Sequence, residues 1–108
     1  MRKIRAIIKR PDEKGHVSFI GDSLENLQRT VDGYIEAVTI MSDVVVICNE
    51  EGRLNGLDPN CRIAGYDFVG TIALLGVAGD EFADLPESIS LKWFKEHMCE
   101  PYGGGSNG

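Results

Sequence analysis

The chain has 108 residues, of which 43% are hydrophobic and 26% are charged, and these proportions are typical of one globular domain with a single core. Its 17 acidic and 11 basic residues give a formal net charge of −6, which argues against direct nucleic-acid binding, because neutralising phosphates needs clustered Lys and Arg. No apolar run is long enough to span a membrane, and three cysteines without C-x-x-C spacing indicate neither a disulfide framework nor a zinc ribbon. We therefore expect a cytoplasmic protein with no membrane association and no cofactor.

The first predicted element is a strand over residues 4–9, followed by a turn at 11–15 and a returning strand at 16–20. One face of the first strand is apolar and consists of Ile4, Ala6 and Ile8. Basic residues precede and flank this strand, and we interpret them as a solvated sheet edge: Arg2, Lys3, Arg5, Lys9 and Arg10.

A helix is predicted over about residues 22–32, with Asp22 or Ser23 as its N-cap. Its apolar face consists of residues at helical spacing, Leu24, Leu27 and Val31. Gly33 is expected to be the left-handed residue that ends the helix, and a strand follows at 34–40.

Residues 44–48 are continuously apolar and β-branched, which is typical of a central strand covered on both faces. A hairpin is predicted next, with Gly52 at a turn position of positive φ and a short return strand at 53–57. Residues 58–60 are expected to stop this strand, and residues 61–67 to form a loop.

A second apolar run covers residues 68–77, and its two glycines predict a strand that bends, bulges or lets another backbone approach closely. A C-terminal helix is predicted over about residues 86–98, with Pro86 at its first position. Its apolar stripe is expected to contain Leu85, Ile89, Trp93 and His97, flanked by Phe94. The domain should span 1–102, followed by a flexible Gly/Ser tail at 103–108.

These elements predict an α+β fold, with a mainly antiparallel sheet of five or six strands and the 22–32 helix packed on one face. The 86–98 helix is expected to close an edge or the same face. Two helices would leave apolar sheet uncovered, and this would favour a homodimer.

Short motifs, in order along the chain, resemble those of domain-of-unknown-function family 3846, which is found in bacteria, phages and conjugative elements. They are SLENLQ at 23–28, DGYIE at 32–36, CNEEG at 48–52, GL at 56–57, PN at 59–60 and VGT at 69–71. The resemblance covers about residues 4–79. It carries no activity, but it implies a mobile-element accessory protein, often one that acts on host defence or regulation.

Polar and turn residues are densest over residues 49–60, where they could bind a small polar ligand or partner, or could simply be what tight turns require. The candidate binding residues are Tyr34, Glu36, Asn49, Glu50, Asn55, Asp58, Asn60, Asp67 and Thr71. Trp93 and Phe94 would anchor a partner if exposed, although core packing is the simpler interpretation.

Glu36 lies inside a predicted strand. If its face is buried it needs a partner such as Arg53 or Arg62, whereas an open face would leave it unremarkable. Glu50 and Glu51 are adjacent, so we interpret them as solvated turn charges rather than as a catalytic pair.

Cys48 is interpreted as a small buried hydrophobe, and no catalytic residue is assigned. His97, Met98 and Cys99 with Cys61 could supply metal ligands, but nothing in their spacing requires a metal, and none is assigned.

Three functions remain open. The favoured one is a non-enzymatic accessory protein that binds and blocks a host protein or sequesters a small, nucleotide-like molecule. The second is an acidic DNA mimic directed at a nuclease or restriction enzyme, for which a net charge of −6 is modest. The third is a small hydrolase that uses Glu36, Asn49, Asp58 and Asp67 around a cleft.

Overall fold

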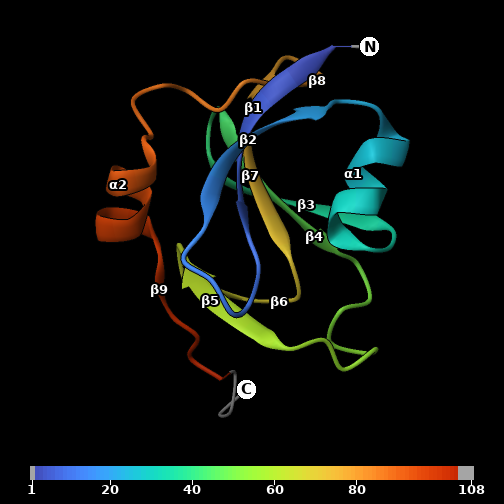
Figure 1. Cartoon of the computed structure of the whole chain (residues 1–108), viewed down its shortest axis with the longest axis vertical. Coiled ribbons are helices and arrows are strands. Elements are labelled where there is room, and N and C mark those ends of the chain that lie inside the picture. The colour runs from blue at the N-terminus through green and yellow to red at the C-terminus, as the bar shows by residue number, and fades with distance from the viewer. Residues whose placement is uncertain (1, 105–108) are drawn as a thin grey trace.

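The computed structural model describes residues 2–104 and forms two antiparallel sheets with short helices around them (Figure 1). In chain order the elements are β1 (Lys3–Lys9), β2 (His16–Gly21), α1 (Leu24–Val31), β3 (Ile35–Met41), β4 (Val44–Asn49), β5 (Pro59–Ile63), β6 (Tyr66–Val69), β7 (Ile72–Ala78), β8 (Glu81–Ala83), α2 (Leu91–Trp93), the π-helical segment η1 (Phe94–Met98) and β9 (Glu100–Pro101).

The main sheet has six strands in the order β2-β1-β7-β4-β3, with β8 paired to β7. The second sheet has the order β6-β5-β9, and every pairing in both sheets is antiparallel. This confirms the α+β class and the mainly antiparallel sheet. The second sheet is an addition that the sequence pattern did not predict.

The main sheet separates two hydrophobic cores. On one face α1 packs over β4 and β7, and Leu27 and Val31 are buried there. On the other face lie the second sheet and the C-terminal helical segment, which buries Phe94 and Met98. Figure 1 shows α1 and α2 on opposite sides of the main sheet, so the prediction that the second helix closes an edge or the same face is wrong.

The homodimer was expected because two helices would leave apolar sheet uncovered. In the structure the second sheet covers much of that surface, so this reason for a homodimer does not apply. Dimerisation therefore stays an untested expectation. No helix within residues 2–104 is long and apolar enough to cross a membrane. Most of the predicted Gly/Ser tail, 105–108, lies outside the described residues.

Helix α1 begins as its sequence predicts. The Ser23 hydroxyl accepts a hydrogen bond from the Asn26 backbone N–H, which caps the first turn. The predicted apolar face is wrong at Leu24, which is 59% exposed, because it lies in the first turn, beyond the reach of the sheet.

The end of α1 also differs from its prediction. The left-handed residue is Asp32, with φ of 59°, and its backbone N–H donates to the Gln28 carbonyl. Gly33 serves a different purpose, because a Cβ at this position would lie 2.5 Å from the side-chain nitrogen of Asn49. The glycine therefore makes room for a buried amide.

The basic residues of β1 do not form a solvated edge, because β1 lies inside the main sheet between β2 and β7. The Arg5 guanidinium donates to three carbonyl oxygens of the segment before α2, those of Leu85, Pro86 and Ile89, at 3.0–3.1 Å. Lys9 is only 7% exposed, and its ammonium donates to Oδ1 of Asn60 at 2.7 Å. Both residues join the main sheet to other parts of the fold.

Residues 50–56 form consecutive turns and Leu57 lies outside any strand, instead of the predicted hairpin and return strand. Gly52 has no positive φ; it is buried, and a Cβ there would meet the Val69 side chain at 2.8 Å. The loop predicted for 61–67 is also wrong, because β5 and β6 form a tight hairpin there. Its two turn residues, Ala64 and Gly65, both have positive φ, the conformation that a type I′ turn requires.

The apolar run 68–77 is split by Gly70, whose φ of 73° turns the chain from the second sheet into the main one. Gly76 confirms the predicted close approach of another backbone, since a Cβ there would lie only 2.1 Å from the carbonyl oxygen of Asp84.

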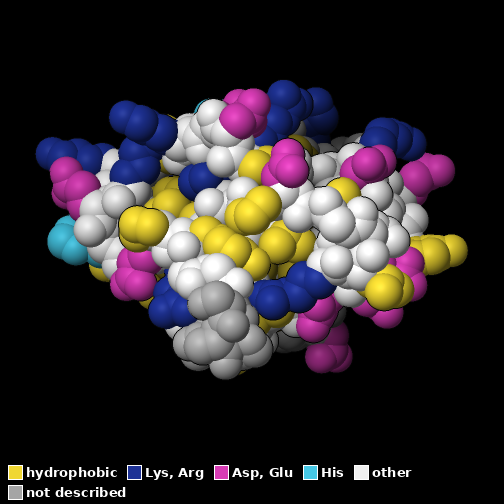
Figure 2. Space-filling model, turned by 90° about the horizontal axis from the view of Figure 1, so that it is seen from below, with side chains coloured by type: hydrophobic (Ala, Val, Ile, Leu, Met, Phe, Trp, Pro, Cys, Tyr) yellow, Lys and Arg dark blue, Asp and Glu magenta, His cyan; other side chains and the backbone are white. Residues whose placement is uncertain are grey.

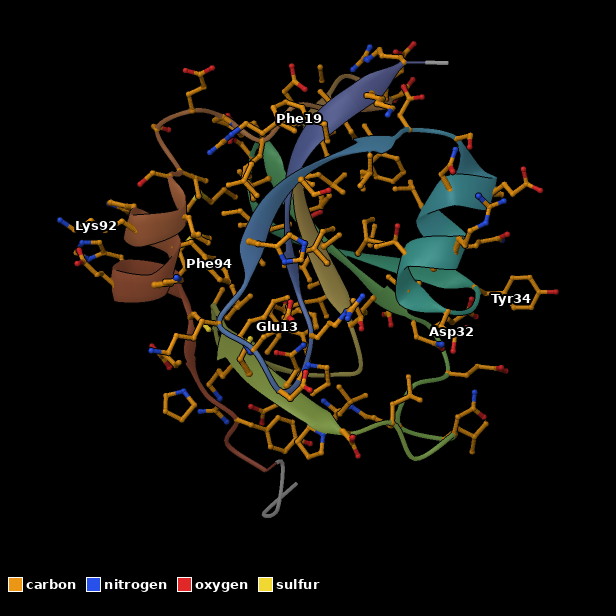
Figure 3. All side chains as sticks on the ribbon, in the orientation of Figure 1. Glu13, Phe19, Asp32, Tyr34, Lys92 and Phe94 are labelled. Atoms are coloured by element: carbon orange, nitrogen blue, oxygen red, sulfur yellow. The ribbon has the colours of Figure 1, made fainter. Side chains whose placement is uncertain are left out.

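The C-terminal helix is shorter than predicted. Pro86 precedes it, and the helix begins at Leu91 after the N-cap Ser90. The wider π-helical turn carries Phe94 into the core (Figure 3), whereas Trp93 is 38% exposed and stacks beside His97, with ring centroids 5.0 Å apart. The predicted stripe is therefore correct for the buried Leu85 and Ile89 and wrong for Trp93 and His97.

Candidate functional site

A cavity of about 450 Å3 opens between the β3–β4 side of the main sheet, the first turns of segment 50–57 and β6. We call it the acidic pocket. Its volume is in the range of small-molecule sites. Its apolar lining includes Val38, Cys48, Tyr66, Phe68 and Val69, and its charged lining is Glu36, Glu50, Glu51, Arg53 and Asp67. The end of the molecule that carries the second sheet shows hydrophobic side chains at its centre with charged groups around them (Figure 2).

The main-sheet wall of the pocket is set by strand register. Glu36 on β3 lies directly opposite Cys48 on β4, so both side chains share one face. Cys48 is 7% exposed, which confirms that it is a buried apolar residue; burial raises the pKa of its thiol to about 11, with the Glu36 charge adding to the rise. Within residues 2–104, the Glu36 carboxylate forms no hydrogen bond or ion pair, and the residue is exposed.

The two arginines suggested as partners of Glu36 both bind Asp67. The Arg62 guanidinium contacts both carboxylate oxygens of Asp67 at 3.1 Å, and this hydrogen bonding raises the pKa of Arg62. Arg53 donates to the backbone carbonyl of Asp67, and the Gly103 N–H donates to its carboxylate at 2.8 Å. The Asp67 carboxylate is therefore part of the structure that holds β5, β6 and the C-terminal segment together.

Asn49 closes the pocket beside α1 and is 8% exposed. Its side-chain N–H groups donate to the carbonyls of Val31 and Asp32, at 3.3 and 3.1 Å, and its Oδ1 accepts from the Glu51 N–H at 2.8 Å. One side-chain amide thus donates hydrogen bonds to carbonyl groups at the C-terminal end of α1 and accepts one at the start of segment 50–57. Its polar atoms are already used by the fold.

The β6 wall is aromatic. Phe68 is buried, and Tyr66 is 52% exposed, with the two ring centroids 6.4 Å apart and tilted by 41°. An exposed ring beside an apolar floor offers a surface on which a flat ligand can stack. The sequence pattern missed Tyr66 because residues 61–67 were expected to be a loop, and it placed Phe68 in the apolar strand at 68–77 without assigning it to a site. The sequence feature that would have predicted this hairpin is Ala64-Gly65, which lies between two segments of alternating apolar and polar residues.

The pocket brings together only part of the predicted set. Glu36, Asn49, Glu50 and Asp67 line it. Tyr34 and Asn55 line a neighbouring hollow of about 280 Å3 instead, and the Tyr34 ring points away from the protein (Figure 3). The remaining candidates, Asp58, Asn60 and Thr71, line neither cavity. The amide of Asn60 donates to the carbonyls of Lys9 and Gly70, so its role is structural.

Glu50 and Glu51 are exposed, as turn charges should be. Of the two candidate partner anchors, Phe94 lies in the core and only Trp93 reaches the surface. Within the described residues, no group of three or more His, Cys, Asp and Glu side chains is placed to hold a metal ion.

The charged lining of the acidic pocket is unbalanced: the Asp67 carboxylate is paired with Arg62, and Glu36, Glu50 and Glu51 supply three further carboxylates against the single guanidinium of Arg53. Like charges lining a partly enclosed site raise the cost of bringing in a phosphate and favour a cation or an N–H donor.

A family model described as a domain of unknown function, DUF3846, matches residues 4–98. The match is wider than the sequence motifs indicated, since it extends past residue 79 to the end of the C-terminal helical segment. No curated protein and no solved structure matches the chain.

Proposed function

The chain belongs to the DUF3846 family, and from the acidic pocket we propose that it is a binding protein without catalytic activity. Its ligand would be a small, flat, nitrogen-rich molecule of the nucleobase or nucleoside class. The observation that carries the proposal is a cavity of about 450 Å3 with an exposed aromatic ring on one wall and a surplus of carboxylates on the others.

Binding is favoured over hydrolysis because the polar groups that would perform catalysis are already used by the fold. The Asn49 amide caps α1, and the Asp67 carboxylate is held by Arg62 and the Gly103 N–H. Asp58, the fourth residue of the hydrolase hypothesis, is outside the pocket. Of the residues in the hydrolase hypothesis that line the pocket, Glu36 is the one whose carboxylate forms no hydrogen bond or ion pair within residues 2–104, and a single exposed carboxylate lacks the oriented partner typical of a general acid or base.

The ligand class follows from the two walls. The Tyr66 ring offers a stacking face, and the Glu36 carboxylate opposite the apolar floor accepts hydrogen bonds but donates none. Amino and ring N–H groups of a nucleobase satisfy such an acceptor. A 5′-phosphate would instead meet the surrounding carboxylates, so the unphosphorylated form should bind more tightly.

The test is a thermal-shift titration with nucleobases, nucleosides and their 5′-monophosphates. We expect the nucleoside to raise the melting temperature, and the matching monophosphate to bind about tenfold more weakly, a difference of ~1.4 kcal/mol. Glu36→Gln should abolish the preference without destabilising the protein, whereas the exposed Glu87→Gln, remote from the pocket, should not change it. Tighter binding of the monophosphate, or no shift with any compound, would contradict the proposal.

The cellular role that we propose is sequestration of such a molecule, or occlusion of a host protein that displays a similar group, by a mobile-element accessory protein acting against host defence. Native mass spectrometry of the protein purified from its producing cells, before and after denaturation, tests this directly. A co-purifying small mass supports sequestration, a co-purifying host chain supports occlusion, and the same spectra report whether the protein is a dimer.

A further inference from the structure

A second cavity, of about 380 Å3, lies between the β1–β2 turn and the C-terminal helical segment. It is lined by Lys9, Glu13, Lys14, Lys95 and Cys99, and we call it the basic pocket. The β1–β2 turn, where Glu13 is labelled in Figure 3, reaches down beside β5, and the Lys9–Asn60 hydrogen bond joins these two parts. Three ammonium groups here face one carboxylate, the reverse of the acidic pocket.

The positive charge of this pocket is poorly neutralised. The ammonium of Lys9, a buried residue, donates only to neutral oxygens, Oδ1 of Asn60 at 2.7 Å and the Arg10 carbonyl at 3.4 Å. Within residues 2–104, Lys14 and Lys95 form no ion pair. The single carboxylate, Glu13, lies 3.2 Å from the His16 ring. The pocket is therefore suited to an anion.

Two thiols meet at the inner side of the pocket. Cys99 is half-buried and lines the cavity, and Cys61 is buried on β5 behind it. Cys99 packs against the hydrophobic cluster to which Cys61 belongs. Strands β5 and β9 pair with Cys61 opposite Pro101, so the alternation of side chains puts Cys99 on the same face as Cys61. The two thiols are thus neighbours, one accessible and one enclosed.

From this geometry we propose that Cys99 is a reactive thiol, and that the basic pocket takes a small anionic disulfide of the glutathione disulfide class, with Cys61 completing the reaction. In the first step the Cys99 thiolate attacks one sulfur of the bound disulfide. A mixed disulfide forms on Cys99, the reagent's S–S bond breaks, and one thiolate leaves with the electron pair. In the second step Cys61 loses its proton and attacks the Cys99 sulfur, which forms a Cys61–Cys99 disulfide and releases the second thiolate.

The environments of the two thiols assign these roles. Lys14 and Lys95 line the same cavity as Cys99, so their ammonium groups attract the carboxylates of the reagent toward this thiol. Burial raises the pKa of Cys61 to about 12, with the charge of Cys99 adding to the rise and Lys9 opposing it. Once Cys99 carries a mixed disulfide its negative charge is gone, so Cys61 loses its proton more readily at the stage when it must attack.

Cys48 provides an internal comparison. Its thiol also lines a cavity, but that cavity is the acidic pocket, and burial and Glu36 both raise its pKa. An anionic reagent should therefore react slowly with Cys48, while a cationic one should not be repelled from it. The two pockets predict opposite charge preferences for the two thiols of one protein.

The experiment compares glutathione disulfide, which is anionic, with cystamine, a cationic disulfide, on the reduced full-length chain. Intact mass spectrometry follows the reaction with time, and peptide mapping identifies the cysteines. We expect Cys99 to react with glutathione disulfide about tenfold or more faster than with cystamine at low salt, and added salt to reduce this ratio. The product should be a protein that has lost two hydrogen atoms and carries no glutathione.

Variants separate the steps. Cys61→Ser should accumulate the mixed disulfide on Cys99, and Cys99→Ser should prevent both modifications. Lys14→Gln and Lys95→Gln should each slow the reaction with glutathione disulfide by about threefold, whereas Lys92→Gln, whose side chain points away from the fold in Figure 3, should not. These lysines are exposed, so the variants remain informative if a cysteine variant unfolds. Equal rates with both reagents, or first reaction at Cys48, would overturn the proposal.

Discussion

Replacing Asn49 by Asp tests whether one buried amide holds the acidic pocket to the rest of the fold. The two side chains have the same shape, but the variant has no N–H groups to donate. At neutral pH a carboxylate oxygen would face the carbonyls of Val31 and Asp32, at the positions now 3.3 and 3.1 Å from the amide nitrogen. The bond from the Glu51 N–H would be kept.

The magnitude follows from these contacts. Two lost hydrogen bonds cost about 1 kcal/mol each. The new charge lies against the negative end of the α1 dipole, which adds about 0.5 kcal/mol. Burying a carboxylate at a position that is 8% exposed adds about 2 kcal/mol. We therefore expect Asn49→Asp to lower the free energy of unfolding by about 4.5 kcal/mol at pH 7, and Asn49→Ala, which brings in no charge but loses all three hydrogen bonds, by about 3 kcal/mol.

The Asp variant should also respond to pH. Burial and the facing carbonyls raise the pKa of the new carboxyl in the folded state above its unfolded value of about 3.9. A raised carboxyl pKa means that the folded state holds the proton more tightly. The extra destabilisation is therefore absent below the unfolded pKa, grows as the pH rises toward the folded pKa and is complete above it.

Urea unfolding followed by far-UV circular dichroism, at several pH values between 4 and 7, measures both effects. Asn49→Ala is the control, because it removes these two hydrogen bonds, together with the bond from the Glu51 N–H, without adding a titrating group. A loss below about 1 kcal/mol for Asn49→Asp, or an equal loss for the Asp and Ala variants across the whole pH range, would refute the assignment of Asn49 as the cap of α1.

Two further substitutions test contacts that join distant parts of the chain. Arg5→Met removes three hydrogen bonds to carbonyls of the segment before α2, so we expect a loss of about 3 kcal/mol and faster amide exchange over residues 84–90 than in β4. Gly33→Ala places a Cβ about 2.5 Å from the Asn49 amide, so it should cost about 2 kcal/mol. Most of that cost should vanish in an Asn49→Ala background, and additive losses in the urea double-mutant cycle would disprove the clash.

The parts of the fold that sequence pattern predicted are those governed by local chemistry. Continuous β-branched residues at 44–48 gave the central strand, and Ser23 gave the start of α1. The predictions are wrong where the local conformation depends on contacts with residues that are distant in the sequence. Gly33 is needed for the Asn49 side chain rather than for a positive φ, and Ala64 adopts a turn conformation that a non-glycine residue rarely takes.

The site was partly predictable for the same reason. Asn49 and Asp67 were candidates as polar residues in predicted turns and loops, and Glu36 as a charge inside a predicted strand, and all three line the acidic pocket. Their roles depend on pairing between elements, which no local pattern reports. The Asp67 carboxylate is bound by Arg62 on the neighbouring strand and by the N–H of Gly103, which is 36 residues away in the sequence. Tyr66 forms a wall of the pocket only because β5 and β6 pair in a second sheet.

The net charge of −6 describes neither pocket. Electrostatic interactions are screened over about 8 Å at physiological ionic strength, whereas the molecule measures 39 × 29 × 24 Å. A ligand therefore responds to the charges that line its own cavity. In the acidic pocket these are the carboxylates of Glu36, Glu50 and Glu51 and the guanidinium of Arg53, since Asp67 is paired with Arg62; in the basic pocket they are three ammonium groups and one carboxylate. Because the two linings share no residue, Glu36→Gln should leave the Cys99 reaction unchanged, and Lys14→Gln should leave nucleoside binding unchanged. The two proposals can thus fail independently of each other.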